Sequence, residues 1–109
     1  MKPAKSKNIV AIGMSDARLR RLISTLAANS GNVLFSTHAR KRMKERRILA
    51  TQVLYVLTHG IVIEPAHQDI HGNWKCTLQA TSAGEVVKVA AALTDDASGK
   101  QVVVITVMN

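Results

Sequence analysis

One stretch of the chain, residues 37–48, places a histidine among many cations. It holds six of the fifteen Lys and Arg residues and a single acid. If it is helical, each residue advances by about 100° around the axis, so His38, Arg42 and Arg46 form one stripe between the apolar side and solvent. The Arg guanidinium binds phosphate through two hydrogen bonds, and His exchanges a proton near neutral pH. These three residues are therefore a candidate catalytic site for cleaving RNA through its own 2′-hydroxyl, without a metal.

Further cations point outward from the same stretch and form a candidate nucleic-acid-binding surface together with one tyrosine that follows. The residues are Arg40, Lys41, Lys44, Arg47 and Tyr55. Tyr55 has a phenol that can donate to phosphate, and packing between helices is its alternative role. Glu45 lies at the spacing for surface ion pairs with Lys41 and Arg42, as on an ordinary solvated helix. Spacing alone does not decide between three interpretations of this helix, namely a solvated face, an anion-binding surface and a catalytic surface.

The net charge of +8 is unevenly distributed along the 109 residues. Residues 1–47 contain twelve Lys and Arg residues against two acids, whereas residues 48–109 contain three against five. This asymmetry predicts an anionic partner, such as RNA, DNA or an acidic protein. No apolar run reaches the roughly 18 residues of a membrane span, and the single cysteine cannot form an internal disulfide. We therefore expect a cytoplasmic protein that does not enter a membrane.

The first half of the chain shows the signals of three helices after a basic arm at residues 1–14. Ser15 is a typical N-cap, and apolar residues then recur at helical spacing, namely Leu19, Leu22, Ile23, Leu26 and Ala27. Gly31 is expected to end this helix in the left-handed conformation. Residues 33–35 are either a strand or a lead-in to the basic helix, which Ser36 or Thr37 caps. Thr51 is expected to cap a third helix that Gly60 ends.

The second half has the pattern of β-strands. Residues 61–63 are β-branched and are expected to end at Glu64-Pro65, followed by a polar loop to Asn73. Apolar and polar residues alternate over 74–81. Residues 86–93 and 102–108 are apolar at nearly every position, which predicts that both of their faces are covered. The expected fold is α+β, with the helices packed on one face of a four- to five-stranded, mainly antiparallel sheet.

The motif His38-Ala39-x-x-Arg42-Met43-x-x-Arg46-x-Ile48, followed by a short helix and a sheet that closes on residues 104–107, resembles the domain family of unknown function numbered 4258. That family is similar in build to the RelE and BrnT toxins and to the wider barnase, EndoU, colicin and RelE group of small ribonucleases. The resemblance covers residues 33–109 and leaves residues 1–32 as an added arm and helix. It implies an RNA-cleaving toxin with an acidic antitoxin partner. By this resemblance His38, Arg42 and Arg46 belong to the site, and Thr106 matches a polar position on the last strand.

Several alternatives remain at this point. A non-catalytic basic module would hold nucleic acid or an acidic protein with the same stretch, and the first helix could dock a partner or a second copy of the chain as a homodimer. His67 and His71 are four apart, but Pro65 and Gly72 predict a loop there, and no cysteine or carboxylate cluster completes a metal site. Glu64 and Asp69 could supply a base. We expect no metal and no cofactor, and we expect Cys76 to be buried and inert.

Overall fold

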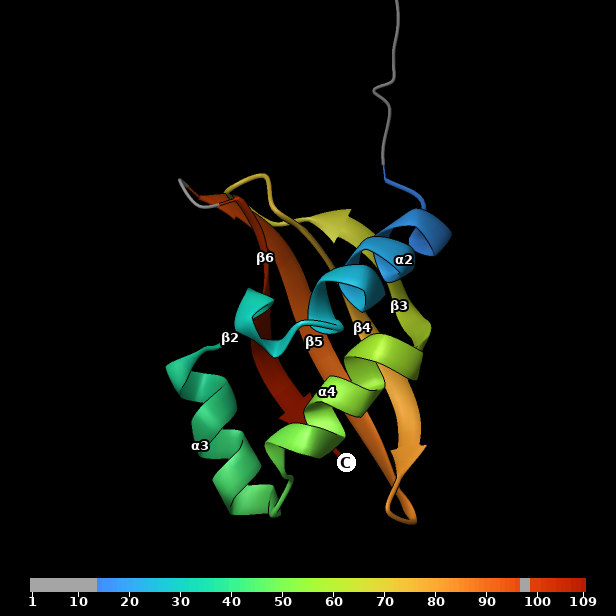
Figure 1. Ribbon diagram of the computed structural model, residues 1–109, viewed down its shortest axis with the longest axis vertical. Coiled ribbons are helices and arrows are strands. Elements are labelled where there is room, and N and C mark those ends of the chain that lie inside the picture. The colour runs from blue at the N-terminus through green and yellow to red at the C-terminus, as the bar shows by residue number, and fades with distance from the viewer. Residues whose placement is uncertain (1–13, 97–98) are drawn as a thin grey trace, which may run out of the picture.

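The computed structural model describes residues 14–96 and 99–109, and in this part three helices pack against a five-stranded mixed sheet (Figure 1). The helices are α2 (Asp16–Ala27), α3 (Thr37–Arg46) and α4 (Ala50–His59), with a 3₁₀ turn at Ser30–Asn32. The strands are β2 (Val33–Phe35), β3 (Ile61–Gln68), β4 (Trp74–Ser82), β5 (Glu85–Asp96) and β6 (Gly99–Met108). The α+β class expected from the sequence is confirmed. The basic arm expected at the N-terminus lies outside the described residues, apart from Met14.

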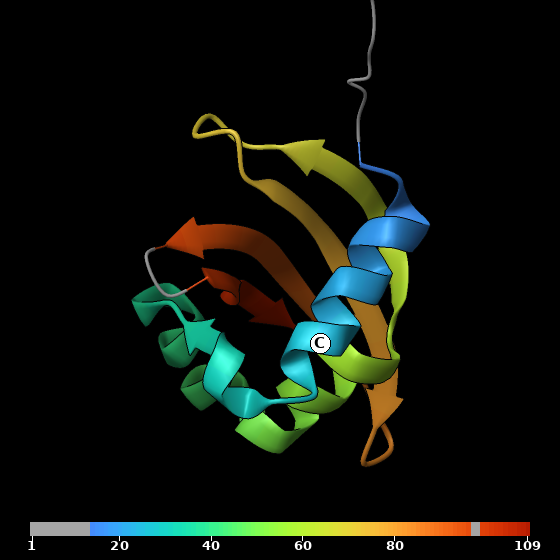
Figure 2. The same ribbon diagram turned by 45° about the horizontal axis from the view of Figure 1, so that its top comes forward.

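The strand order is β2-β6-β5-β4-β3. Strands β3 to β6 form an antiparallel meander, and β2 adds to β6 in parallel, with Val33 opposite Val102. Figure 1 shows α2 and α4 lying across one face of the sheet, whereas α3 lies beside β6. Figure 2 shows the loop end of the β3–β4 hairpin projecting beyond the helices. The parallel pairing of β2 brings the start of α3 to the edge of the sheet.

Helix α2 begins as expected and ends differently. The Ser15 side chain accepts a hydrogen bond from the backbone N–H of Arg18 at 3.1 Å. Gly31 does not take the left-handed conformation, so that prediction is wrong. Instead the chain enters the 3₁₀ turn, where the Asn29 side chain accepts from the N–H of Gly31 and the Asn32 side chain donates to the carbonyl of Leu26. Two asparagine side chains thus satisfy backbone groups at this helix end.

The apolar face of α2 packs inside the chain. Leu19 and Ile23 are fully buried and belong to the same core as α4 and the sheet. The apolar face of α2, which the sequence offers for docking a partner or a second copy, is therefore covered by α4 and the sheet of the same chain. None of the helices in the described part of the chain has both the length and the hydrophobicity that crossing a membrane requires.

Ser36 joins α3 to the last strand. Its hydroxyl oxygen accepts from the N–H of Ala39 at 3.0 Å, as an N-cap does, and its O–H donates to the carbonyl of Ile105 at 2.9 Å. The helix ends at Arg46, and its C-cap Arg47 takes the left-handed conformation with φ 56°. Ala39 is fully buried, so the apolar side of this short helix faces the core and its charged residues face outward.

The N-cap of helix α4 lies two residues before the expected one. Leu49, not Thr51, holds the N-cap position, and the Gln52 side chain accepts from the N–H of Leu49 at 2.9 Å. The expectation that Gly60 ends the helix is confirmed. Its dihedrals, φ −73° and ψ 165°, suit any residue, and close packing of backbone atoms around it explains why glycine is needed there.

Strand β3 is longer than its sequence suggests. It continues through Glu64 and Pro65 to Gln68, because Glu64 pairs with Thr77 and His67 with Lys75 on β4. A proline is tolerated because β3 is an edge strand, where its missing N–H costs no ladder bond. The prediction that the strand ends at Glu64-Pro65 is therefore wrong, and His67 lies on a strand and not in a loop.

The loop of residues 69–73 is organised by a side chain. The Asp69 carboxylate accepts from the N–H groups of His71 at 2.8 Å and Asn73 at 3.0 Å. Desolvation raises the pKa of this carboxyl, but the hydrogen bonds from Asn73 and His71 outweigh it. The pKa of Asp69 therefore lies below its ordinary value of 3.8.

The two faces of β5 and β6 differ in burial. The side facing the helices is fully buried, and it comprises Val87, Val89, Ala91, Val102, Val104 and Val107. On the opposite side Ala92 is buried, whereas Lys88, Ala90, Val103, Ile105 and Thr106 are only half-buried. The prediction that both faces are covered is wrong, because branched apolar residues on the second face stabilise the strands without a covering layer. We call this second side the open face.

Candidate functional site

Helix α3 presents the cations of the candidate site to solvent. His38, Lys41, Arg42 and Glu45 line one shallow hollow on its surface. His38 and Lys41 are exposed, and Arg42 is half-buried. A proton-exchanging group thus lies beside two cations, as the sequence predicted for His38 and Arg42. Lys41, which the sequence predicts to lie on the outer surface, borders the same hollow.

Each arginine of the predicted stripe has an additional partner. An Arg42 guanidinium nitrogen lies 3.6 Å from a Glu45 carboxylate oxygen, and both side chains are more than one third exposed. Such a surface pair contributes at most about 1 kcal/mol and exchanges readily for another anion. Arg46 donates from Nη1 to Oδ1 of Asn109 at 3.2 Å. This hydrogen bond points the Arg46 side chain toward the C-terminal residue. Arg46 is not among the residues that line the hollow of His38.

The outer cations of α3 differ in their local contacts. The Arg40 Nε donates to the Phe35 carbonyl at 3.4 Å, and its guanidinium lies 5.9 Å from the centre of the Phe35 ring, within the range of a cation–π contact. Lys44 and Arg47 are exposed. Arg40 and Lys44 are exposed and can contact a polyanion. Arg47 borders a separate hollow.

Tyr55 belongs to that separate hollow. It lines a concavity with Arg47 and Leu49 at the junction of α3 and α4. Its ring stacks on His59, with centroids 4.6 Å apart, and the residue is 44% exposed. Tyr55 therefore does not fill the core, and it shares a surface with Arg47 but not with His38.

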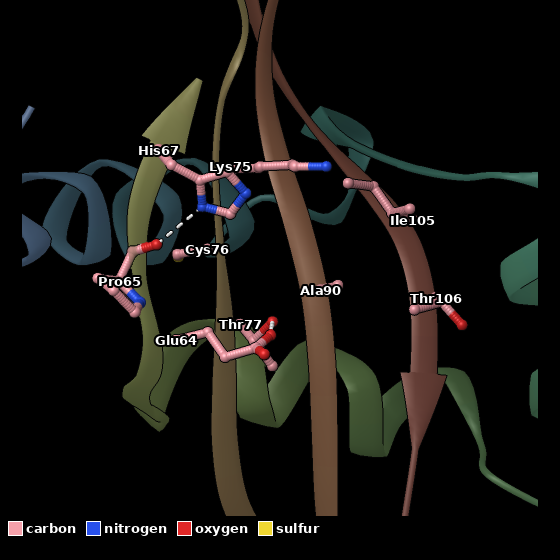
Figure 3. Close-up of a pocket in the computed structure, with 9 residues that line it drawn as sticks. All are labelled: Glu64, Pro65, His67, Lys75, Cys76, Thr77, Ala90, Ile105 and Thr106. Atoms are coloured by element: carbon pink, nitrogen blue, oxygen red, sulfur yellow. Dashed lines mark hydrogen bonds between the residues drawn. The ribbon is translucent and has the colours of Figure 1, made fainter. Parts of the chain in front are cut away.

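Thr106 lies on the open face of the sheet, in a third hollow. This hollow is lined by Glu64, Pro65, His67, Lys75, Cys76, Thr77, Ala90, Ile105 and Thr106, and none of them comes from α3 (Figure 3). The Thr106 hydroxyl points away from Glu64 and Thr77 in this view. The structure thus brings together His38 and Arg42 but places Thr106 with a set of strand residues. We call this set the open-face hollow.

Two polar side chains of the open-face hollow are held in fixed orientations. The buried Thr77 hydroxyl donates to Oε1 of Glu64 at 2.5 Å. His67 Nδ1 lies 3.0 Å from the carbonyl oxygen of Pro65, which only accepts, so Nδ1 carries the proton of this hydrogen bond. Nε2 of His67 is then left for another partner. Figure 3 shows the Lys75 side chain extending across the sheet between these groups and Ile105.

Irregular strand pairing is concentrated at this hollow. The β3–β4 register shifts on both sides of Glu64, and the β5–β6 register shifts between Ala90 and Ala91, where Ile105 is the extra residue. Bulges re-aim side chains and are enriched beside functional sites. The hollow is therefore shaped by local departures from a regular sheet, and Ala90 leaves space at its floor.

Sequence reasoning missed Lys75 and Thr77 as site residues. The alternation over 74–81 places both residues on the face opposite Cys76, so the sequence does indicate that they share a face. Their alignment with Glu64 and His67 depends on long-range strand pairing, which the sequence does not indicate. Glu64, which the sequence offers as a candidate base, accepts a hydrogen bond from Thr77 in the structure. Cys76 is buried as expected, and burial raises the pKa of its thiol to about 11, with a smaller contribution from the charge of Asp16. A thiol of this kind is a poor nucleophile at neutral pH.

Comparison with known proteins identifies the family. A family model described as a domain of unknown function (DUF4258) matches residues 35–109, so the chain belongs to this family. No curated protein and no solved structure matches the chain. The similarity to the RelE and BrnT toxins stays a prediction. Helix α2 lies outside the matched residues, although it shares the core of the matched part.

Proposed function

We propose that this DUF4258 protein is a toxin-type endoribonuclease that needs no metal and uses the hollow of His38 on α3. The observation that carries the proposal is the position of His38 beside Lys41 and Arg42 in one surface concavity. An imidazole exchanges protons near neutral pH, and the two cations attract and hold a phosphate. Arg46 and the outer cations Arg40, Lys44 and Arg47 extend the positive surface on which an RNA strand is held.

In the proposed reaction the 2′-oxygen of RNA attacks the adjacent phosphorus, and the bond from phosphorus to the 5′-oxygen breaks. A 2′,3′-cyclic phosphate and a free 5′-hydroxyl result. Neutral His38 accepts the proton of the 2′-hydroxyl, or its protonated form supplies the proton of the leaving oxygen, and water completes the other transfer. Arg42 and Lys41 stabilise the charge that develops on the phosphate oxygens. Before that, the phosphate displaces Glu45 from Arg42.

The same face fits an acidic controlling protein. Residues 1–47 carry a large excess of positive charge over residues 48–109, and an antitoxin with the opposite charge would cover α3 and block RNA. A cytoplasmic location follows from this proposal, since its substrate is cellular RNA. The open-face hollow, which includes Thr106, is not needed for this step.

A second candidate is a non-catalytic module that binds RNA, DNA or an acidic protein. The observation that favours it is Glu45, which lines the hollow of His38 and neutralises part of its charge through Arg42. In this case binding depends on the number of cations and falls steeply with salt. Loss of Lys41 and Lys44 then matters more than loss of His38.

The decisive experiment is incubation of purified protein with total RNA in EDTA. We compare the parent with His38→Ala and Arg42→Ala, and we use His71→Ala and Arg21→Ala as matched controls, because both side chains are exposed and lie outside the hollow. Cleavage that only the first two variants lose supports the nuclease. Intact RNA that is retarded on a gel at low salt supports the binding module. Equal cleavage by His38→Ala and the parent refutes the proposed site.

A further inference from the structure

We propose that the open-face hollow is a binding site for a nucleotide unit, with its phosphate at Lys75 and an amino group of its base at Glu64. This inference concerns a different surface from α3 and does not depend on RNA cleavage. The hollow has a volume of about 610 Å³, within the roughly 300–1,000 Å³ of ordinary ligand pockets. A mononucleotide fits this size.

The charged groups of the hollow are separated in a way that suits such a ligand. Glu64 is engaged by Thr77, and no ion pair joins it to Lys75 in the part of the chain that the structure describes. Lys75 therefore keeps its charge for an anion. Nε2 of His67, the neighbour of Lys75 across the strand pair, is left as an acceptor, to which a hydroxyl group of the ligand can donate. A ligand that satisfies both ends must carry an anionic group and a hydrogen-bond donor.

The floor of the hollow and part of its far wall are apolar. Ala90 on β5 and Ile105 on β6 separate the polar groups of β3 and β4 from the outer edge of the sheet (Figure 3). A flat ring packs against such a surface without leaving polar atoms unpaired. The hollow thus combines an apolar floor, a carboxylate held by a buried hydroxyl, and an ammonium that forms no ion pair within residues 14–96 and 99–109. These features suit a planar anion that carries an amino group.

The bulges explain why the side chains converge. A regular β3 would place Glu64 and His67, three residues apart, on opposite faces, because side chains alternate along a strand. The register shift between them adds one residue and returns His67 to the face of Glu64. Both can then contact one ligand.

A titration with adenosine monophosphate (AMP), adenosine and inorganic phosphate tests the inference. Calorimetry measures affinity, and ¹H–¹⁵N NMR locates each ligand. We expect AMP to shift the amide signals of Thr77 and Ala90 and to bind more tightly than either fragment. Absence of AMP binding at millimolar concentration, or shifts confined to α3, would overturn the inference.

Variants assign the two ends of the ligand. Lys75→Met should weaken binding of AMP and phosphate about tenfold or more, and Glu64→Ala should weaken AMP and adenosine to a similar degree but leave phosphate unchanged. Lys88→Met and Glu85→Ala are the matched controls, because they remove the same charges from the same sheet outside the hollow. Equal losses in the control pair would refute the assignment.

A third variant tests the cavity itself. Ala90→Leu fills the floor without changing charge and should abolish AMP binding, while circular dichroism confirms that the sheet is intact. A short single-stranded RNA then separates the two sources of the ligand. If Lys75→Met weakens RNA binding as well, the hollow takes a nucleotide within a chain, and if only AMP is affected, it takes the free nucleotide. Unchanged AMP affinity in Ala90→Leu would contradict the proposal.

Discussion

Gly60 connects α4 to β3, and its replacement by alanine tests how the edge strand of the open-face hollow is held. Its backbone dihedrals are open to any residue, so chain entropy alone predicts that Gly60→Ala stabilises the fold by about 0.4–1 kcal/mol. The packing predicts the opposite sign. A Cβ at this position would lie 2.5 Å from the Val56 carbonyl oxygen and 3.0 Å from the Gln79 carbonyl oxygen.

These contacts cannot be relieved by rotating a side chain. The Val56 carbonyl accepts the N–H of Gly60 at 2.7 Å, and the Gly60 carbonyl accepts from Nε of Arg20 at 2.6 Å. A backbone shift that accommodates the methyl group therefore strains both hydrogen bonds and the pairing of Ile61 with Gln79. Overpacking of this kind costs about 1–3 kcal/mol. A contact of 2.5 Å with a backbone oxygen belongs at the upper end of this range. After the entropic gain is subtracted, we expect a net loss near 2 kcal/mol, or roughly 8 °C in Tm at about 4 °C per kcal/mol.

Urea unfolding followed by circular dichroism measures the effect, with a lower midpoint and an unchanged m-value as the expected result. Gly31→Ala is the matched control. There the nearest atom to the added Cβ is the side-chain Oδ1 of Asn29 at 3.2 Å, which can move, so the change should stay within about 0.5 kcal/mol. Gly60→Ala with a stability equal to or above that of the parent would refute the packing argument.

Three further outcomes follow from single side chains. Ser36→Ala removes both the cap of α3 and the bond to the Ile105 carbonyl, and it should cost about 1–2 kcal/mol in urea unfolding; a neutral result would mean that α3 is held by packing alone. Cys76, with its pKa raised to about 11, should react with a thiol reagent at pH 8 about a hundredfold more slowly than an exposed cysteine near its ordinary pKa, and rapid labelling of the native protein would contradict its burial. Because the folded pKa of Asp69 is lowered, its stabilising effect is present above the unfolded pKa and is lost as the pH falls through the folded value. Asp69→Asn should therefore be less stable than the parent at pH 7 and equal to it in strong acid, and a constant difference across this range would disprove the linkage.

The helices of this protein could be predicted from sequence because their signals are local. Ser15 and Ser36 have the right side chains to cap the turns that follow them, and the apolar positions of α2 recur at helical spacing. The cations of α3 were placed correctly outside the core for the same reason, because Ala39 supplies the buried contact and its neighbours must point elsewhere. The proximity of His38 and Arg42 needed only the geometry of one helix.

The sequence predicted that the second half of the chain forms an antiparallel sheet, but it did not predict where the strands end or which residues pair. Strand β3 was expected to stop at Pro65, and only pairing with β4 carries it on to Gln68. Gly60 was identified as a helix end, yet the carbonyl oxygens that crowd it come from both α4 and β4. Local preference cannot reveal such contacts, because the partner strand is distant in the chain.

The sequence by itself determined the α+β class, the charge asymmetry and the set of groups on α3, since each depends on residue type and short-range period. Tertiary structure alone decided that Thr106 lies apart from the hollow of His38 and that Glu64, His67 and Lys75 share one hollow. The physical reason is register. A shift of one residue moves a side chain to the other face of a strand, and the bulges that set the register here arise from pairing between segments far apart in the sequence.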